Sequence, residues 1–184
     1  MNVIARAGQP AFSEQTSFDR RDLVACGEGT LEGGGLPKLP RRRMLMFDRV
    51  TDSQPVGGEF GRGFITAELD INPDLWFFDD HFKDDPVMPG CLGLDALWQL
   101  AGFFVVLCGA RGKGRALEVG HVKFAGEVLP TAKLLTYRVE VKGLLNGRST
   151  RPWIVTTDGY VACDGVTIYT AKDIKVGVFP KPQG

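Results

Sequence analysis

One stretch of the chain is apolar at nearly every position. Between Cys91 and Cys108 the only strongly polar side chains are Asp95 and Gln99. An apolar run of this length, preceded by Pro89 and Gly90, predicts a helix that is buried on nearly every side. Asp95 and Gln99 are four positions apart, so both side chains fall on the same face of that helix.

The later part of the chain changes to a period of two. Leu135, Tyr137, Val139 and Val141 alternate with polar residues, which predicts a half-buried antiparallel strand. Asn-Gly and Asp-Gly pairs favour tight turns between strands. These pairs are Asn146-Gly147 and Asp164-Gly165, and the further strands are expected over Trp153–Thr157, Tyr160–Cys163 and Val166–Val178.

The first part of the chain predicts shorter elements. Ser17 is expected to cap a helix that Gly27 ends. A Gly-rich and Pro-rich stretch then reads as a surface linker. The expected elements are a helix over Phe18–Cys26, the linker Gly33–Pro40, strands over Met44–Val50 and Phe60–Leu69 with a turn around Pro55–Gly58, and a helical turn over Pro73–Phe78.

This order predicts an α+β fold, in which a curved antiparallel sheet wraps around one long central apolar helix. Residues 1–17 are expected to be a flexible leader, and residues 18–184 a single domain. The apolar run is about the minimum length of a membrane span. It contains Asp95 and Gln99, however, so we expect a buried core helix and no membrane span.

The composition excludes some classes of function. The 22 basic and 22 acidic residues give a formal net charge of zero, which argues against a dedicated nucleic-acid binder. The four cysteines have no Cys-x-x-Cys spacing, so we expect reduced, buried thiols in a cytoplasmic protein. Neither a disulfide frame nor a metal site is expected.

His81 lies in a loop rich in acids and prolines, just before the apolar run. An imidazole titrates near neutral pH, so His81 is a candidate base. A solvated acidic turn or a weak cation site is the alternative for this loop, which also holds Asp79, Asp80, Asp84 and Asp85. The second histidine, His121, falls in a strand-like stretch and is expected to be structural or on the surface.

Asp95 is a candidate acid, because burial raises the pKa of a carboxyl group. Gly90 and Cys91 open the predicted helix, where free N–H groups can bind a developing oxyanion. A base, an acid and an oxyanion site together can remove a proton next to a carbonyl and expel a β-hydroxyl as water. Gln99 and Val87 are expected to support these groups, and no metal or organic cofactor is needed.

Six tracts of the chain resemble the bacterial 3-hydroxydecanoyl-acyl carrier protein dehydratase/isomerase, a member of the β-hydroxyacyl-carrier-protein dehydratase family. The similarity runs from about Phe18 to Phe179. The tracts are Leu69–Phe78, His81-Phe82, Asp85–Ala96, Gly112–Leu117, Val128–Lys133 and Asp173–Gly177.

The resemblance implies a hot-dog fold and a homodimer with shared active sites, acting in unsaturated fatty acid synthesis. It implies that His81 and Asp95 are the catalytic pair and come from opposite subunits, and that the N–H of Gly90 binds the thioester carbonyl. The phosphopantetheine arm then belongs to the acyl carrier protein and is not a cofactor of the enzyme. Dehydratase-only relatives carry Glu in place of Asp95, which favours the version that also isomerises trans-2 to cis-3.

Acyl carrier proteins are acidic, so a rim of basic residues is expected to steer them. Scattered solvated charges are the alternative, and Gly143 and Gly147 stand where the family leads us to expect basic residues. A dehydratase without isomerase activity, a hot-dog thioesterase and a non-catalytic acyl-chain binding module also remain open. The rim candidates are Arg111, Lys113, Arg115, Lys142, Arg148, Arg151 and Lys175.

Overall fold

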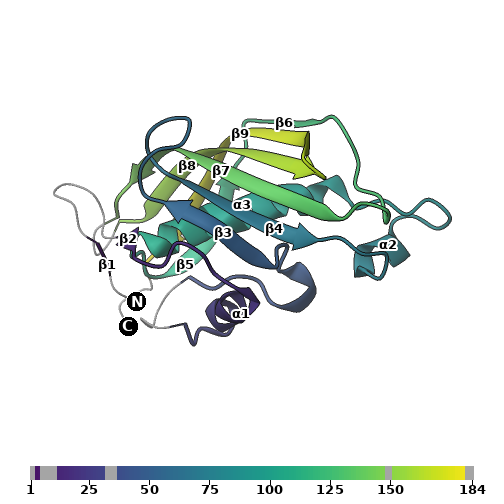
Figure 1. Cartoon of the computed structure of the whole chain (residues 1–184). Helices are drawn as coiled ribbons and strands as arrows, with labels where there is room; N and C mark the ends of the chain where they lie inside the picture. Colours follow the sequence, from purple (N-terminus) through teal and green to yellow (C-terminus); the bar gives the residue numbers. More distant parts are fainter. Residues whose placement is uncertain (1–2, 5–11, 32–36, 148–150, 181–184) are drawn as a thin grey trace.

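A curved antiparallel sheet wraps around one long helix, α3 (Gly90–Leu107), in the computed structural model (Figure 1). The structure describes residues 3–4, 12–31, 37–147 and 151–180. Within these ranges the arrangement confirms the predicted α+β architecture, with the apolar run as the central helix.

The sheet has the strand order β3-β4-β7-β8-β9-β5, and β6 also pairs with β9. Every pairing is antiparallel. The strands are β3 (Arg49–Gln54), β4 (Phe64–Asp70), β5 (Lys113–Glu118), β6 (His121–Phe124), β7 (Leu134–Leu145), β8 (Trp153–Cys163) and β9 (Val166–Phe179). The remaining elements are a small ladder of β1 (Val3–Ile4) and β2 (Phe12–Ser13), the helices α1 (Arg20–Glu28) and α2 (Trp76–Asp80), and the 3-10 turn η1 (Arg42–Met44).

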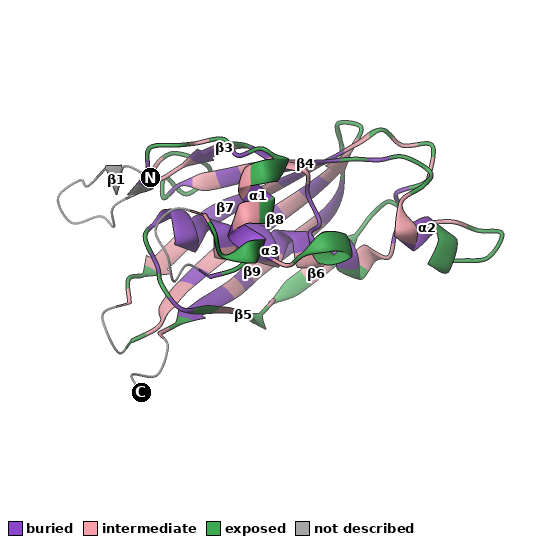
Figure 2. Cartoon of the chain, turned by 90° about the horizontal axis from the view of Figure 1, so that it is seen from below, coloured by how far each residue is buried: buried purple, intermediate pink, exposed green. Residues whose placement is uncertain are grey.

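The core is built on α3, which begins after Pro89 as predicted. Figure 2 shows buried residues concentrated on this helix and on the strands that face it. The helix is long and apolar enough to cross a membrane by length and composition, yet 67% of it is buried inside the protein. The surrounding sheet therefore gives α3 the role of a core helix.

The predicted alternation in β7 is confirmed, because Leu135, Tyr137, Val139 and Val141 are all buried. Glu140 is buried as well, against the pattern. Its carboxylate accepts a hydrogen bond from Arg138 Nε at 2.6 Å and another from the backbone N–H of Glu59 at 2.9 Å. These two donors compensate for the loss of water around the charge.

The predicted boundaries in the first part of the chain are wrong. Asp19, not Ser17, caps α1, because its carboxylate accepts the N–H groups of Arg21 and Asp22, and the helix ends at Gly29. The stretch predicted as a strand over Met44–Val50 begins with η1 and an irregular segment, and β3 starts only at Arg49. The backbone near Met44 bonds to a helix side chain instead of a neighbouring strand.

The turns behave differently from one another. Asp164 and Gly165 have φ angles of 47° and 85°, as a tight hairpin turn requires, so this prediction is confirmed. Asn146-Gly147 does not make a two-residue turn, because β7 ends at Leu145 and β8 begins at Trp153; residues 148–150 lie outside the described ranges. The two strands predicted on either side of Asp158 form one strand, β8, with a shift of register there.

Helix α3 packs most closely on the sheet at Gly93. A Cβ atom added there would overlap Tyr169 of β9, with Cδ2 at 2.8 Å and Cε2 nearer still. We expect Gly93→Ala to lower the free energy of unfolding by about 1–3 kcal/mol, because the core has no room for the methyl group. Denaturant unfolding measures the loss.

The matched control is Gly102→Ala in the same helix. There an added Cβ would meet only Val176 Cγ1, at 3.6 Å. Alanine favours a helix over glycine by about 1 kcal/mol, so this variant should be neutral or more stable. Equal losses at both positions would contradict the close contact at Gly93.

Candidate functional site

Asp95 lies on α3 and is half-buried. Its Oδ2 accepts a hydrogen bond of 2.6 Å from Gln99 Nε2, so the prediction that the two side chains share one face of the helix is confirmed. Burial raises the pKa of the Asp95 carboxyl above its ordinary value, and the hydrogen bond from Gln99 offsets part of that rise. Among the described residues, no cation pairs with this carboxyl. The group is therefore suited to hold a proton and to release it to a substrate.

Gln99 also binds the main chain of residues 37–46, which we call the strap. Its Nε2 donates to Met44 O at 2.8 Å, and its Oε1 accepts from the N–H of Met46 at 3.1 Å. One buried amide thus satisfies two backbone groups of the strap and positions the carboxyl of Asp95 at the same time.

A cavity of about 170 Å³ lies beside Asp95. The helix lines it at a spacing of three or four residues, from Asp95 to Val106, which corresponds to a length of about 16 Å. It is therefore elongated along α3. The lining residues come from the strap, one stripe of α3, β5 and β9: Pro37, Lys38, Leu39, Pro40, Asp95, Trp98, Gln99, Gly102, Phe103, Val106, Gly114, Arg115, Ala116 and Val176.

His81 follows α2 in a loop, and its ring is held by Val87. His81 Nδ1 lies 2.8 Å from Val87 O. A carbonyl oxygen can only accept, so Nδ1 carries the hydrogen, and in the neutral ring Nε2 is left with its lone pair. The ring of Phe82 covers that of His81, with centroids 3.6 Å apart. Val87 thus selects the tautomer in which Nε2 can accept a proton.

Gly90 and Cys91 form the start of α3. Among the described residues, neither backbone N–H has a hydrogen-bond acceptor, so both can donate to a ligand. An added Cβ at Gly90 would lie 3.0 Å from the ring of Phe124, so only glycine fits beside β6 without displacing it. The thiol of Cys91 is exposed and that of Cys163 partly so, which corrects the expectation that all four thiols are buried.

The two titratable groups belong to different surroundings within one chain. The described residues that line the Asp95 cavity include none from the loop that carries His81. Asp79 and Asp80 at the end of α2, and Asp84 and Asp85 in that loop, are exposed. Across the described residues, no three His, Cys, Asp or Glu side chains converge as metal ligands would.

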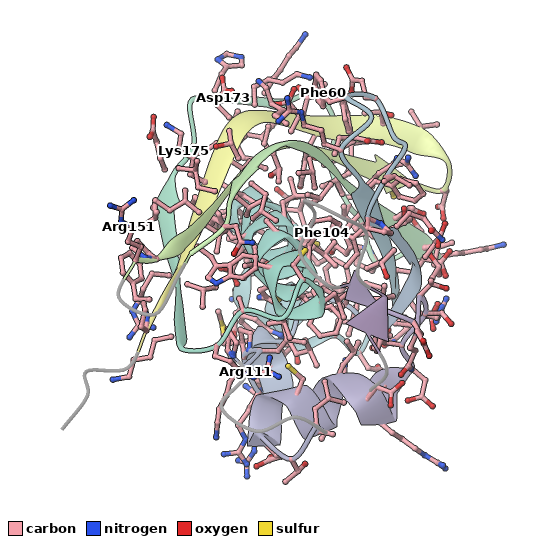
Figure 3. All side chains as sticks on the ribbon, turned by 90° about the vertical axis from the view of Figure 1, so that its left-hand side faces the viewer. Phe60, Phe104, Arg111, Arg151, Asp173 and Lys175 are labelled. Carbon is pink, nitrogen blue, oxygen red and sulfur yellow. The ribbon has the colours of Figure 1, made fainter. Side chains whose placement is uncertain are left out.

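The residues expected to form a basic rim differ in whether their charge is paired within the chain. Lys142 binds Asp158 and Asp173, and Lys175 binds Glu118, so both charges are compensated within the chain. Within the described ranges, Arg111 and Arg115 donate only to backbone carbonyls, and Lys113 is exposed. Figure 3 shows Arg151 and Lys175 on one side of the molecule and Arg111 nearer α1, while Arg148 lies outside the described residues.

Sequence reasoning missed part of the cavity wall. Pro37–Pro40 of the strap were expected to belong to the surface linker Gly33–Pro40, yet these residues line the cavity. Trp98 and Gly102 were not singled out, although their spacing from Asp95 on a helix would have indicated a shared face. No local signal indicates that the strap packs there, because its contacts are with residues far along the chain.

Asp95→Asn should be more stable than the native protein at neutral pH. A raised folded-state pKa gives stability that is complete below the unfolded pKa and is lost as the pH rises through the folded pKa. Asparagine does not titrate, and its Oδ1 can still accept from Gln99. The difference in unfolding free energy in favour of the variant should therefore grow between about pH 3 and pH 7. Urea unfolding at a series of pH values measures this difference.

Asp70→Asn is the control with the opposite sign. Arg49 binds the Asp70 carboxylate at 2.7 Å and lowers its pKa, so the native protein should gain relative to this variant as the pH rises. Asp70 is exposed, so the effect is small. A fall in the relative stability of Asp95→Asn with rising pH would show that the native carboxylate stabilises the fold.

Comparisons with known proteins agree with the fold. The FabA-like domain matches residues 39–172. The dehydratase heterocomplex ApeI:P from Xenorhabdus doucetiae is 14% identical, with a TM-score of 0.54 over 78% of this chain and 89% of that one. PH1136 from Pyrococcus horikoshii is 11% identical, with a TM-score of 0.51 over 76% of this chain and 88% of that one. These structures share the hot-dog fold, and because the family match spans most of the sequence, the chain belongs to the FabA-like domain family.

Proposed function

We propose that the protein dehydrates 3-hydroxyacyl chains of about the decanoyl length that are thioester-linked to acyl carrier protein, and that it isomerises the product from trans-2 to cis-3. The proposed setting is unsaturated fatty acid synthesis in the bacterial cytoplasm. The observation that carries this proposal is the carboxyl of Asp95, which lines an elongated cavity. Its pKa is raised, and it has no cationic partner among the described residues. Such a group is suited to give a proton to a poor leaving group.

His81 acts as the base in this proposal. Val87 O holds the hydrogen on Nδ1, so the free lone pair of the neutral ring is on Nε2. It removes a proton from C2, next to the thioester carbonyl. The electron pair of the broken C2–H bond moves into an enolate.

The start of α3 stabilises that enolate. The N–H groups of Gly90 and Cys91 have no other acceptor among the described residues, and the positive end of the helix dipole lies behind them. Donors that are already oriented lower the energy of a developing negative charge on the carbonyl oxygen.

Asp95 completes the elimination. Its proton passes to the hydroxyl on C3, the C3–O bond breaks, and water leaves as the C2–C3 double bond forms. His81 ends protonated and Asp95 ionised, so a net proton transfer from His81 to Asp95 restores the starting state. In the isomerisation, a base removes a C4 proton, C2 regains one, and the double bond moves to C3–C4.

We further propose that the site is shared between two subunits. The described residues that line the Asp95 cavity include none from the His81 loop, so one chain does not bring the two groups together in that cavity. Strand β6 pairs only with β9 among the described strands, and Phe124 at its end is 51% exposed. This free edge lies beside Gly90 and can pair with a second copy of the chain.

His81→Ala should lower dehydration at least about a hundredfold while the fold is retained, because a general base is lost from a loop. Lys83→Ala is the matched control, since Lys83 is exposed in the same loop. Formation of the enoyl thioester is followed by absorbance, and free thiol is measured in parallel. Release of thiol without enoyl product would identify a thioesterase instead, and near-native turnover of His81→Ala would remove it from the mechanism.

Mixing inactive His81→Ala with inactive Asp95→Asn should restore activity if the site is shared. About half of the exchanged dimers are mixed, and each contains one intact site, so roughly a quarter of native activity should return. Subunit exchange is checked by native mass spectrometry of differently tagged chains. Exchanged mixtures that stay inactive would mean that each chain has its own complete site.

A further inference from the structure

We propose that Lys38 and Arg115 form a phosphate site at the end of the Asp95 cavity away from the reacting groups, and that the phosphate of the carrier protein's phosphopantetheine arm binds there. This inference rests on the proposed function, because it assigns the position of the arm that delivers the substrate. It concerns Lys38, which lies in the strap, and Arg115, which lies on β5; both line the cavity.

The strap and β5 meet where these two residues lie. A Cβ atom on Gly114 would be 3.8 Å from Pro37 Cβ, so residues 37 and 114, each next to one of the two cations, are in contact. Lys38 and Arg115 are both exposed at this junction. Two cations from different segments therefore stand at the same part of the cavity wall.

Within the part of the chain that the structure describes, neither cation is neutralised by a carboxylate. Among the described residues, Arg115 donates only to Gly114 O at 2.7 Å, and Lys38 Nζ donates only to Glu28 O at 3.1 Å. By contrast, the neighbouring Arg41 binds Glu28 Oε1 at 2.6 Å. Each of the two groups keeps further N–H donors for an anion. Exposed Arg42 and Arg43, also without an ion pair among the described residues, add to the local positive charge.

The two cations lie far enough from Asp95 for an extended arm. Trp98 Nε1 donates to Glu118 O, so the end of β5 lies beside the Asp95 end of the helix stripe. Arg115 comes three residues earlier, which is about 10 Å along an extended strand. In the strap, Gln99 binds Met44, and Lys38 lies six residues before Met44. Both cations therefore lie toward the C-terminal end of α3. Figure 3 shows the molecule from this end.

Phosphopantetheine has matching chemistry. It is an extended chain with the thioester at one end and the phosphate at the other. With the thioester at Gly90 and Asp95, the arm follows the cavity and its phosphate reaches Lys38 and Arg115. Arginine and lysine bind phosphate through charge-assisted hydrogen bonds, which are stronger than neutral ones.

The test compares two small substrates, the 3-hydroxydecanoyl thioesters of pantetheine and of 4′-phosphopantetheine, which differ only by the phosphate. The native enzyme should show about tenfold higher kcat/KM for the phosphorylated substrate, mainly through KM. Arg115→Ala and Lys38→Ala should each reduce this preference, and the double variant should abolish it, so that kcat/KM becomes about equal for the two substrates.

Arg21→Ala is the control, because Arg21 is an exposed cation of α1 that does not line the cavity. It should keep the preference, and Arg115→Lys should keep part of it. Lys38 also bonds the end of α1, but a loss of stability lowers activity toward both substrates and cancels in their ratio. A native enzyme without the preference, or a double variant that retains it, would overturn the phosphate site. Failure to dehydrate either substrate would instead overturn the proposed function.

Discussion

The need to cover α3 on every side governs this structure. A helix with so few polar residues is stable in water only when other elements surround it. The sheet can come close enough because glycines face the contact points: Gly93 lies against Tyr169, and a Cβ on Gly159 would lie 2.7 Å from Leu97 Cδ1. The curvature of the sheet, and the burial of any polar group on the helix, follow from that close packing.

Asp95 and Gln99 are the polar exception inside this apolar arrangement. The surrounding core raises the pKa of Asp95, and Gln99 prevents the neighbouring backbone from being left without partners. One glutamine therefore binds both the strap and the Asp95 carboxyl. Its replacement by an apolar residue of similar size would leave two backbone groups of the strap unpaired, at a cost of about 1–3 kcal/mol for each buried group.

The sequence predicted the features that depend on local pattern. The central helix, the alternation of β7 and the Asp164-Gly165 turn follow from spacing within a few residues, and the structure confirms them. The family and the fold follow from the tracts around His81 and Asp95. The predicted roles of His81, Asp95, Gly90 and Cys91 remain predictions that the experiments above test.

Features that depend on distant contacts were not predictable in this way. The strap lies against α3 because Gln99 binds Met44 and Met46, more than fifty positions earlier in the chain. Lys142 reads as a free surface cation in the sequence, yet Asp173 binds it at 2.6 Å from another strand. Spacing along one strand or helix carries no information about such partners.

The groups proposed for the chemistry occupy one short unbroken segment, from His81 to Gln99, whereas the rest of the cavity wall is assembled from residues scattered between Pro37 and Val176. Mutation and selection can therefore act on these two parts separately. Changes in the scattered wall can alter which acyl chain or carrier is accepted while the compact segment is inherited intact. Related proteins with this arrangement can therefore diverge in substrate while they keep the same reaction.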